Sequence, residues 1–144
     1  MYQGSEFAFF RHPWNGLPDC VIHADENNVR GHESYRAAKT GDSDAAYNLV
    51  NTFLNDRALR EIERICNNYD ADVFTLVSAH ALEREGVNAI PEAMAELLAT
   101  RLNWTVEHQV VQTNIVSHTK ADGFSRLAKQ AAFEGEIEPN RNYF

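Results

Sequence analysis

The sequence has 144 residues and a formal net charge of −8, with 44% hydrophobic and 24% charged residues. This length and balance suit one globular domain with a single core. A nucleic-acid groove needs Lys and Arg gathered on one face, and a membrane span needs roughly 20 consecutive apolar residues, and the sequence offers neither. We therefore expect no nucleic acid and no membrane among its partners.

Cysteine and histidine usage bears on the compartment and on metals. Cys20 and Cys66 are the two cysteines, too few for a disulfide framework or a cysteine-based zinc site. The N-terminus also lacks a basic patch followed by an apolar stretch, so we expect a cytoplasmic protein. The six histidines show no HxxxH or HxH spacing, and we expect no metal site.

The first half of the chain predicts helices after an irregular start. Residues 1–31 are rich in Pro, Gly, Asn and Asp and predict an irregular lead-in, with one brief strand over 20–22. Apolar residues at helical spacing then predict helices over 33–39, 44–54 and 56–68. The residues that mark the starts of the second and third helices are Asp42 or Ser43, and Asn55 with Asp56.

The second half begins with a strand, helix and strand. Residues 72–79, DVFTLVSA, are β-branched or aromatic and nearly all apolar, which is typical of a strand covered on both faces of a parallel sheet. Pro91 suits the first turn of a helix over 91–102, which Asn103 ends. A second strand is predicted over 104–112. This order predicts a right-handed parallel βαβ unit.

The last part of the chain carries a weaker pattern. We expect a polar loop over 113–123 and a short helix over 124–132. Residues 141–144 then read as the first residues of another buried strand, entered after a Gly/Pro turn, with a continuation missing beyond it. The alternative is an ordinary tail with aromatic anchors.

The loop between the 72–79 strand and the 91–102 helix is the best candidate for a ligand site. Ligands in open α/β sheets lie at the carboxyl ends of strands, and helix N-termini attract anions. The candidate residues in this loop are His80, Arg84, Gly86 and Asn88. Glu83 and Glu85 would oppose an anion unless they face away or help to hold a metal. His80 could equally be a structural histidine, hydrogen-bonded beneath the loop.

A second group of basic residues follows the 104–112 strand. The candidates here are His118, Lys120 and Arg126, with Asp122 as the accompanying acid. They could fold over an anionic ligand, or they could form an ordinary solvated face. The sequence has no GxSxG, GxxxxGK[ST] or GxGxxG motif, so serine hydrolases, P-loop enzymes and dinucleotide-binding proteins lack their first requirement.

These segments together resemble a known family. In order, 72–79, 80–91, 91–102 and 105–112 look like the first strand, pyrophosphate loop, helix and second strand of the type I phosphoribosyltransferase fold. The stretch SHTKADGFSRLA is similar to the flexible segment that follows the second strand, and HESYRAAKTGDSDAAYNLV is similar to the N-terminal region of some members. The resemblance covers most of residues 32–144. It implies a pyrophosphate loop with His80, Arg84, Gly86 and Asn88, and a flexible loop with His118, Lys120 and Arg126.

The sequence departs from the family at one motif. Phosphoribosyltransferases grip their ribose-phosphate substrate through a later strand that ends in two adjacent acids, followed by a Gly/Thr-rich loop, and the sequence ends where such a strand would start. The acid pair Asp25-Glu26 lies before the first strand and lacks that loop, so we reject it. Transfer chemistry depends on positioning and on charge around phosphates and a metal. The resemblance therefore implies Mg²⁺ only as a companion of residual phosphoribosyl pyrophosphate, and no other cofactor.

The expected fold class is α/β, with N-terminal helices and a partial parallel βαβ phosphoribosyltransferase-like, or Rossmann-like, unit. We expect one domain over 1–144, divided into the lead-in 1–31, a helical segment 32–70 and the partial core 71–144. The leading functional hypothesis is a truncated or degenerate phosphoribosyltransferase-like protein, a glycosyltransferase by ancestry. It would bind a phosphorylated small molecule and have little or no transferase activity alone.

Two other hypotheses remain open from the sequence. One is a small interaction module that forms homo-oligomers through exposed sheet edges, because two adjacent strands make a meagre sheet. The other is a complete enzyme of an unrelated kind that uses His80 and nearby acids.

Overall fold

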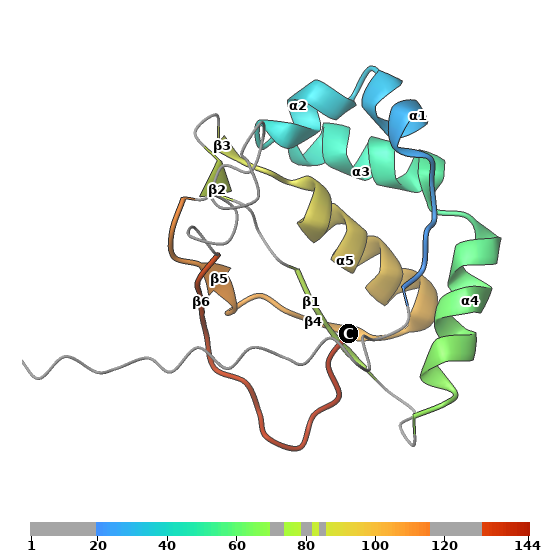
Figure 1. Cartoon of the computed structure of the whole chain (residues 1–144), viewed down its shortest axis with the longest axis vertical. Helices are drawn as coiled ribbons and strands as arrows, with labels where there is room; N and C mark the ends of the chain where they lie inside the picture. Colours follow the sequence, from blue (N-terminus) through green and yellow to red (C-terminus); the bar gives the residue numbers. More distant parts are fainter. Residues whose placement is uncertain (1–19, 70–73, 79–81, 84–85, 116–130) are drawn as a thin grey trace, which may run out of the picture.

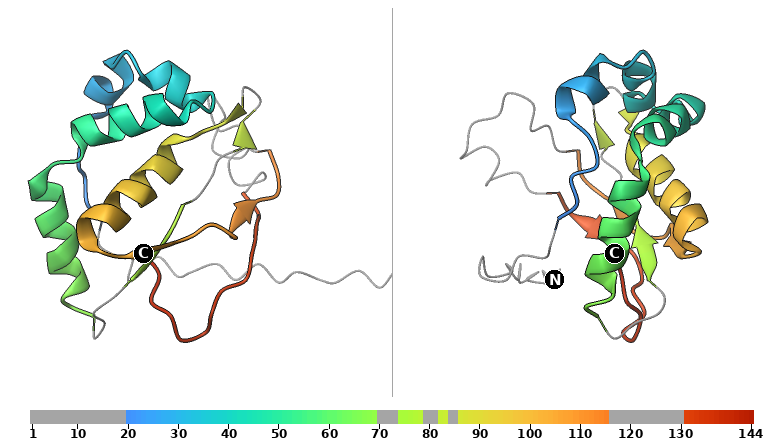
Figure 2. Two further views of the ribbon diagram at one scale, coloured as in Figure 1. Left: turned by 180° about the vertical axis from the view of Figure 1, so that it is seen from behind. Right: turned by 90° about the vertical axis from the view of Figure 1, so that its right-hand side faces the viewer.

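The structure is a computed structural model, and it describes residues 20–69, 74–78, 82–83, 86–115 and 131–144. Its fold is mixed α/β (Figure 1). Four helices come first in the chain, and a parallel pair of strands joined by a fifth helix follows them. The two small antiparallel sheets, each of two short strands, lie on the same side of the molecule in both face-on views (Figures 1 and 2). The predicted α/β class is therefore confirmed.

The N-terminal helices are α1 (Glu26–Gly31), α2 (Tyr35–Lys39), α3 (Ser43–Phe53) and α4 (Asp56–Cys66). The last three confirm the helices predicted from apolar spacing, with shifts of one or two residues at their ends. No helix among the described residues is long and apolar enough to cross a bilayer.

Side-chain caps explain where the two longest of these helices begin. The side chain of Asp42 accepts a hydrogen bond from the backbone N–H of Ala45 at 2.9 Å, ahead of α3. Asn55 does the same for Ala58 at 3.0 Å, ahead of α4. Each cap satisfies one of the N–H groups that has no partner inside the helix.

The lead-in differs from its prediction in two ways. The strand predicted over 20–22 is wrong, since these residues pair with no strand in the described part of the chain and Ile22 is 89% exposed. Helix α1 was not predicted, because none of its six residues is buried and it therefore carries no apolar stripe. Asp25 begins it, accepting hydrogen bonds from the N–H groups of Asn27 and Asn28 at 3.0 and 3.1 Å. The rejected acid pair is thus part of a helix cap.

The parallel pair consists of β1 (Thr75–Val77) and β4 (Thr105–Glu107), connected through helix α5 (Ile90–Leu102). Thr75 lies opposite Thr105 and Val77 opposite Glu107. Helix α5 ends at Asn103, which adopts a left-handed conformation at φ 55° and ψ 44°. These features confirm the predicted strand, helix and strand order and the parallel pairing.

The strand predicted over 104–112 is interrupted. After β4 the carboxylate of Glu107 accepts a hydrogen bond from the N–H of Gln109 at 2.8 Å, which turns the backbone out of the sheet. Pairing resumes in β5 (Val111–Gln112), which is antiparallel to β6 (Phe133–Glu134). The polar run Glu107-His108-Gln109 marks the break, but it is short and lies between apolar residues, so the sequence alone reads as one strand. The helix predicted over 124–132 lies almost wholly outside the described residues.

The C-terminal residues lie alongside β1 on the edge that β4 does not occupy. Thr75 and Tyr143 form a parallel bridge. Thr75 donates its N–H to the carbonyl of Asn142 at 2.8 Å, and Val77 donates to Phe144 at 3.0 Å. Phe144 in turn donates to Thr75 at 2.9 Å. The extended pairing predicted for residues 141–144 is confirmed at Tyr143, so β1 has a parallel neighbour on each edge. The predicted burial is wrong, because residues 141, 142 and 144 are exposed.

The core forms where α5 packs between α3 and the parallel pair (Figure 1). Leu49 of α3 is only 1% exposed, and Phe74 and Leu76 of the β1 segment are also buried. Burial raises the pKa of the Cys66 thiol, which keeps it a neutral packing group. Cys20 is exposed.

A short antiparallel hairpin follows β1 in the chain. It consists of β2 (Leu82–Glu83) and β3 (Gly86–Val87). The N–H of Ala89 donates to the carbonyl of Ala38 at 3.0 Å, which ties the hairpin's exit to the end of α2. This hairpin replaces the plain turn predicted between β1 and α5.

Candidate functional site

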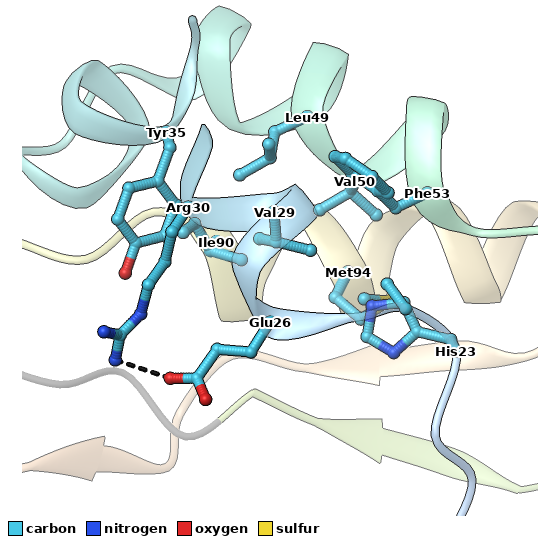
Figure 3. Close-up of a pocket in the computed structure, with 11 residues that line it drawn as sticks. His23, Glu26, Val29, Arg30, Tyr35, Leu49, Val50, Phe53, Ile90 and Met94 are labelled. Atoms are coloured by element: carbon cyan, nitrogen blue, oxygen red, sulfur yellow. Dashed lines mark ion pairs between the residues drawn. The ribbon is translucent and has the colours of Figure 1, made fainter. Parts of the chain in front are cut away.

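The helical side of the molecule contains an apolar pocket of about 280 Å³ between α1, α3 and α5 (Figure 3). Its apolar lining consists of Val29, Leu49, Val50, Phe53, Ile90 and Met94. At its rim Arg30 and Glu26 form an exposed ion pair at 2.5 Å. Partial burial lowers the pKa of His23, which also lines the pocket. The pocket is suited to apolar side chains and has few polar groups directed at one point.

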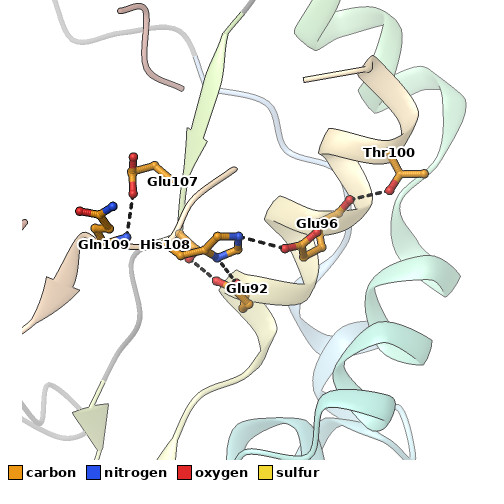
Figure 4. A network of polar contacts seen from close by, with 7 residues as sticks. Glu92, Glu96, Thr100, Glu107, His108 and Gln109 are labelled. Carbon is orange, nitrogen blue, oxygen red and sulfur yellow. Dashed lines mark hydrogen bonds and ion pairs between the residues drawn. The ribbon is translucent and has the colours of Figure 1, made fainter. Parts of the chain in front are cut away.

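Polar side chains converge instead at the carboxyl ends of β1 and β4 (Figure 4). The Nδ1 atom of His108 lies 2.7 Å from Oε1 of Glu92, and its Nε2 atom lies 3.4 Å from Oε1 of Glu96. The hydroxyl of Ser78 donates a hydrogen bond to Oε2 of Glu92. These four residues form what we call the strand-end cluster.

The fold explains why these four residues meet. Ser78 directly follows β1 and His108 directly follows β4, so parallel pairing brings both to the same edge. Glu92 lies in the first turn of α5, which begins near that edge after leaving β1. Glu96 follows one turn later, on the same face of the helix.

Exposure differs across the cluster. Ser78 is buried, with 3% of its surface exposed, whereas the side chains of Glu92, Glu96 and His108 are 30%, 52% and 56% exposed. The Ser78 hydrogen bond therefore fixes one carboxylate from inside. The outer two side chains can move without disturbing the core.

The geometry argues against a serine, histidine and acid relay. In such a relay the serine hydroxyl donates to the histidine that removes its proton. Here the Ser78 hydroxyl donates to Glu92, and each ring nitrogen of His108 faces a carboxylate. The cluster can hold a cation, because one ligand atom each from Glu92, Glu96 and His108 lies within 4.8 Å of the others.

Two of the site residues predicted from the sequence are described. Asn88 accepts a hydrogen bond from the N–H of Ile90 at 3.1 Å and so helps to start α5. Gly86 has φ 135°, and a Cβ added at this position would lie 3.0 Å from the carbonyl oxygen of Thr40. In the described part of the chain, no hydrogen bond joins either residue to the strand-end cluster. The other candidates, namely His80, Arg84, His118, Lys120 and Arg126, lie outside the described residues.

The sequence pointed to the carboxyl end of β1 as a ligand site, but it did not single out the residues that form the strand-end cluster there. Ser78 was included only as a strand residue, and His108 was placed inside a strand. The usable signal was position: a polar residue next to each predicted strand end and glutamates at i and i+4 in the connecting helix. His108 lies in the middle of the strand predicted over 104–112. Only the structure, in which β4 ends at Glu107, shows that His108 lies at the end of a strand.

Comparison with known proteins gives two relatives. The chain is 36% identical over 133 residues to a protein of Escherichia coli named Protein TraN, and 34% identical over 134 residues to an uncharacterized protein of Haemophilus influenzae. Each alignment covers 92% of this chain. The chain spans only 29% of the length of each relative. No family model and no solved structure matches the chain.

Proposed function

We propose that the chain is a phosphoribosyltransferase-like unit that binds a phosphorylated small molecule and has little or no transferase activity by itself. The observation that carries the proposal is the strand order. Three segments pair in parallel, and in chain order they are β1, β4 and the C-terminal residues around Tyr143, which we call the Tyr143 segment. In space β1 lies between the other two. This order, second, first, third, is that of a doubly wound α/β fold at the point where its winding reverses, and ligands bind at the carboxyl ends there.

The resemblance in sequence agrees with this order. The segment that resembles the pyrophosphate loop lies between β1 and α5, and Asn88 of that segment accepts a hydrogen bond from the N–H of Ile90 at the start of α5. A helix start offers free N–H groups to an anion. The Nδ1 atom of His108 lies 2.7 Å from the Glu92 carboxylate beside this helix start. Mg²⁺ would accompany the pyrophosphate as a neutralising ion.

The proposed lack of transferase activity rests on the absence of the family's acidic motif from this sequence. In the family that motif follows the third strand, here the Tyr143 segment, and the sequence contains one adjacent acid pair, Asp25-Glu26. Asp25 is occupied in capping α1. Without an acid pair and a Gly/Thr loop around the ribose phosphate, the positioning and charge stabilisation that drive transfer are largely missing.

Two measurements test the proposal. Purified protein with phosphoribosyl pyrophosphate, Mg²⁺ and a panel of bases should release no pyrophosphate, and robust turnover would refute the inactive state. Calorimetry should detect binding of phosphoribosyl pyrophosphate or pyrophosphate, weakened by Arg84→Ala and unchanged by Arg60→Ala, a substitution on the exposed side of α4. If neither ligand binds, the ligand-binding part of the proposal is wrong.

A second candidate function is an interaction module that forms homo-oligomers through sheet edges. Its support is a group of exposed apolar residues on and beside the β5–β6 strand pair. Val111 and Phe133 are each 46% exposed, Ile137 is 60% exposed and Ile115 is 62% exposed. Short strands with open edges pair readily with a second chain. Light scattering at rising protein concentration tests this candidate, because a strict monomer throughout would argue strongly against it.

A further inference from the structure

We propose that Glu92, Glu96 and His108 form a binding site for a divalent transition-metal ion such as Zn²⁺ or Co²⁺. This inference is independent of phosphate binding. It also departs from the absence of a metal site expected from histidine spacing, because the ligands come from one helix and from the end of a separate strand.

The ligand types and their spacing support the site. Two carboxylates and one imidazole nitrogen are a set that Zn²⁺ and its neighbours accept, whereas Mg²⁺ prefers oxygen atoms alone. The three ligand atoms already lie within 4.8 Å of one another. Atoms bound to one ion at about 2.1 Å lie roughly 3 to 3.5 Å apart, so a small inward movement would bring all three ligand atoms to one ion.

The side chains that must move are the exposed ones. His108 now places a different ring nitrogen toward each carboxylate, and a single ion takes only one of them. His108 and Glu96 are each more than half exposed, so a turn of the ring and a rotamer change of Glu96 displace no core group. The same exposure leaves coordination positions open to water or to a ligand.

Glu92 is the fixed member of the site. Its Oε2 atom accepts the hydrogen bond from buried Ser78, and its Oε1 atom faces His108. Outer hydrogen bonds of this kind orient metal-binding carboxylates, and their loss typically weakens affinity about 10- to 100-fold. Ser78 is therefore inferred to be a positioning residue rather than a ligand.

Calorimetric titration of the full chain with ZnCl₂ tests the site, carried out in a Cys20→Ser background because Cys20 is an exposed thiol. We expect one ion per chain. Glu96→Gln and His108→Gln should each weaken binding by more than tenfold, and Ser78→Ala by about tenfold. Glu63→Gln, an exposed glutamate on α4, is the matched control and should leave the affinity unchanged.

A second readout separates this site from zinc held by other groups. Co²⁺ bound by nitrogen and oxygen gives weak visible bands, and these should disappear in His108→Gln while circular dichroism remains unchanged. Equal affinities in the wild type, Glu96→Gln and His108→Gln would overturn the proposal, as would no detectable Zn²⁺ binding at millimolar concentration. If Ser78→Ala fails to fold, the two exposed variants still decide the question.

Discussion

The ring of Phe144 lies 5.8 Å from the indole of Trp104, with 55° between their planes. Trp104 immediately precedes β4, whereas Phe144 belongs to the segment on the other edge of β1. Phe74, just before β1, contacts both rings, at 5.2 and 6.5 Å. Three parallel segments are thus joined by one aromatic cluster as well as by backbone hydrogen bonds.

Replacing Phe144 with Ala should therefore destabilise the protein by about 1 to 3 kcal/mol, because two aromatic contacts of roughly 0.5 to 1.5 kcal/mol each are lost. The fluorescence of Trp104, recorded in a Trp14→Phe background, should shift to longer wavelength as its surroundings become wetter. Ile137→Ala, at a residue 60% exposed, is the control and should change the unfolding midpoint little. Equal midpoints for the two variants would contradict the role of the cluster.

Leu49 is the largest side chain among the described residues with less than 2% exposure. Leu49→Ala should lower the free energy of unfolding by about 2 to 5 kcal/mol, since it removes buried methyl groups and leaves a cavity between α3 and α5. Urea denaturation measures this change. Tyr47→Ala on the exposed side of the same helix should cost far less, and a similar cost would mean that α3 does not pack as described.

Gly86 should not tolerate a side chain. Its φ of 135° is a conformation that residues with a Cβ rarely adopt, and an added Cβ would lie 3.0 Å from the carbonyl oxygen of Thr40. Gly86→Ala should cost about 1 to 3 kcal/mol in thermal or urea unfolding. Gly31→Ala is the matched control, because a Cβ there meets nothing within 4 Å, and it should be neutral or slightly stabilising.

Asn55 caps α4 and also donates its side-chain amide to the carbonyl of His23 at 3.1 Å. Asn55→Ala should cost about 0.5 to 2 kcal/mol, and helical circular dichroism should be lost at a lower temperature. Asn67→Ala, at the opposite end of α4, provides the comparison because no side-chain cap is made there. A larger loss from Asn67→Ala would show that the cap does not stabilise this helix.

His23 should make stability depend on pH. Burial lowers the pKa of the His23 imidazole in the folded protein, so at mildly acidic pH the unfolded chain binds the proton more readily than the folded one. The free energy of unfolding should therefore fall as the pH drops below the ordinary histidine value of about 6.5. In His23→Gln this part of the fall should be absent, and in His32→Gln it should persist. Identical slopes in wild type and His23→Gln would contradict the prediction.

Local physics accounts for most of what the sequence predicted correctly. Apolar stripes at helical spacing and the capping side chains Asp42 and Asn55 depend on neighbours only a few residues away. The same is true of Asn103, whose left-handed conformation ends α5. The parallel pairing of β1 and β4 was also predictable, because a helix between two apolar segments leaves few other arrangements.

The candidate site shows the opposite case. Nothing near His108 in the sequence predicts that it meets Glu92 and Glu96, which precede it by more than ten residues. The turn at Glu107 ends β4 one residue before His108, and parallel register then sets that residue opposite Ser78. Helix α1 likewise escaped prediction, because its cap is local but its exposed residues carry no apolar period.

The amino-acid order alone thus determined helices α2 to α5 and the two strands of the parallel pair, since those follow from short-range periodicity and capping. Only the tertiary structure decided that β1 lies between two parallel neighbours, and which side chains face one another at its end. Contacts between residues 12 to 68 positions apart depend on the register in which the elements pack, and the order of residues along the chain does not show that register.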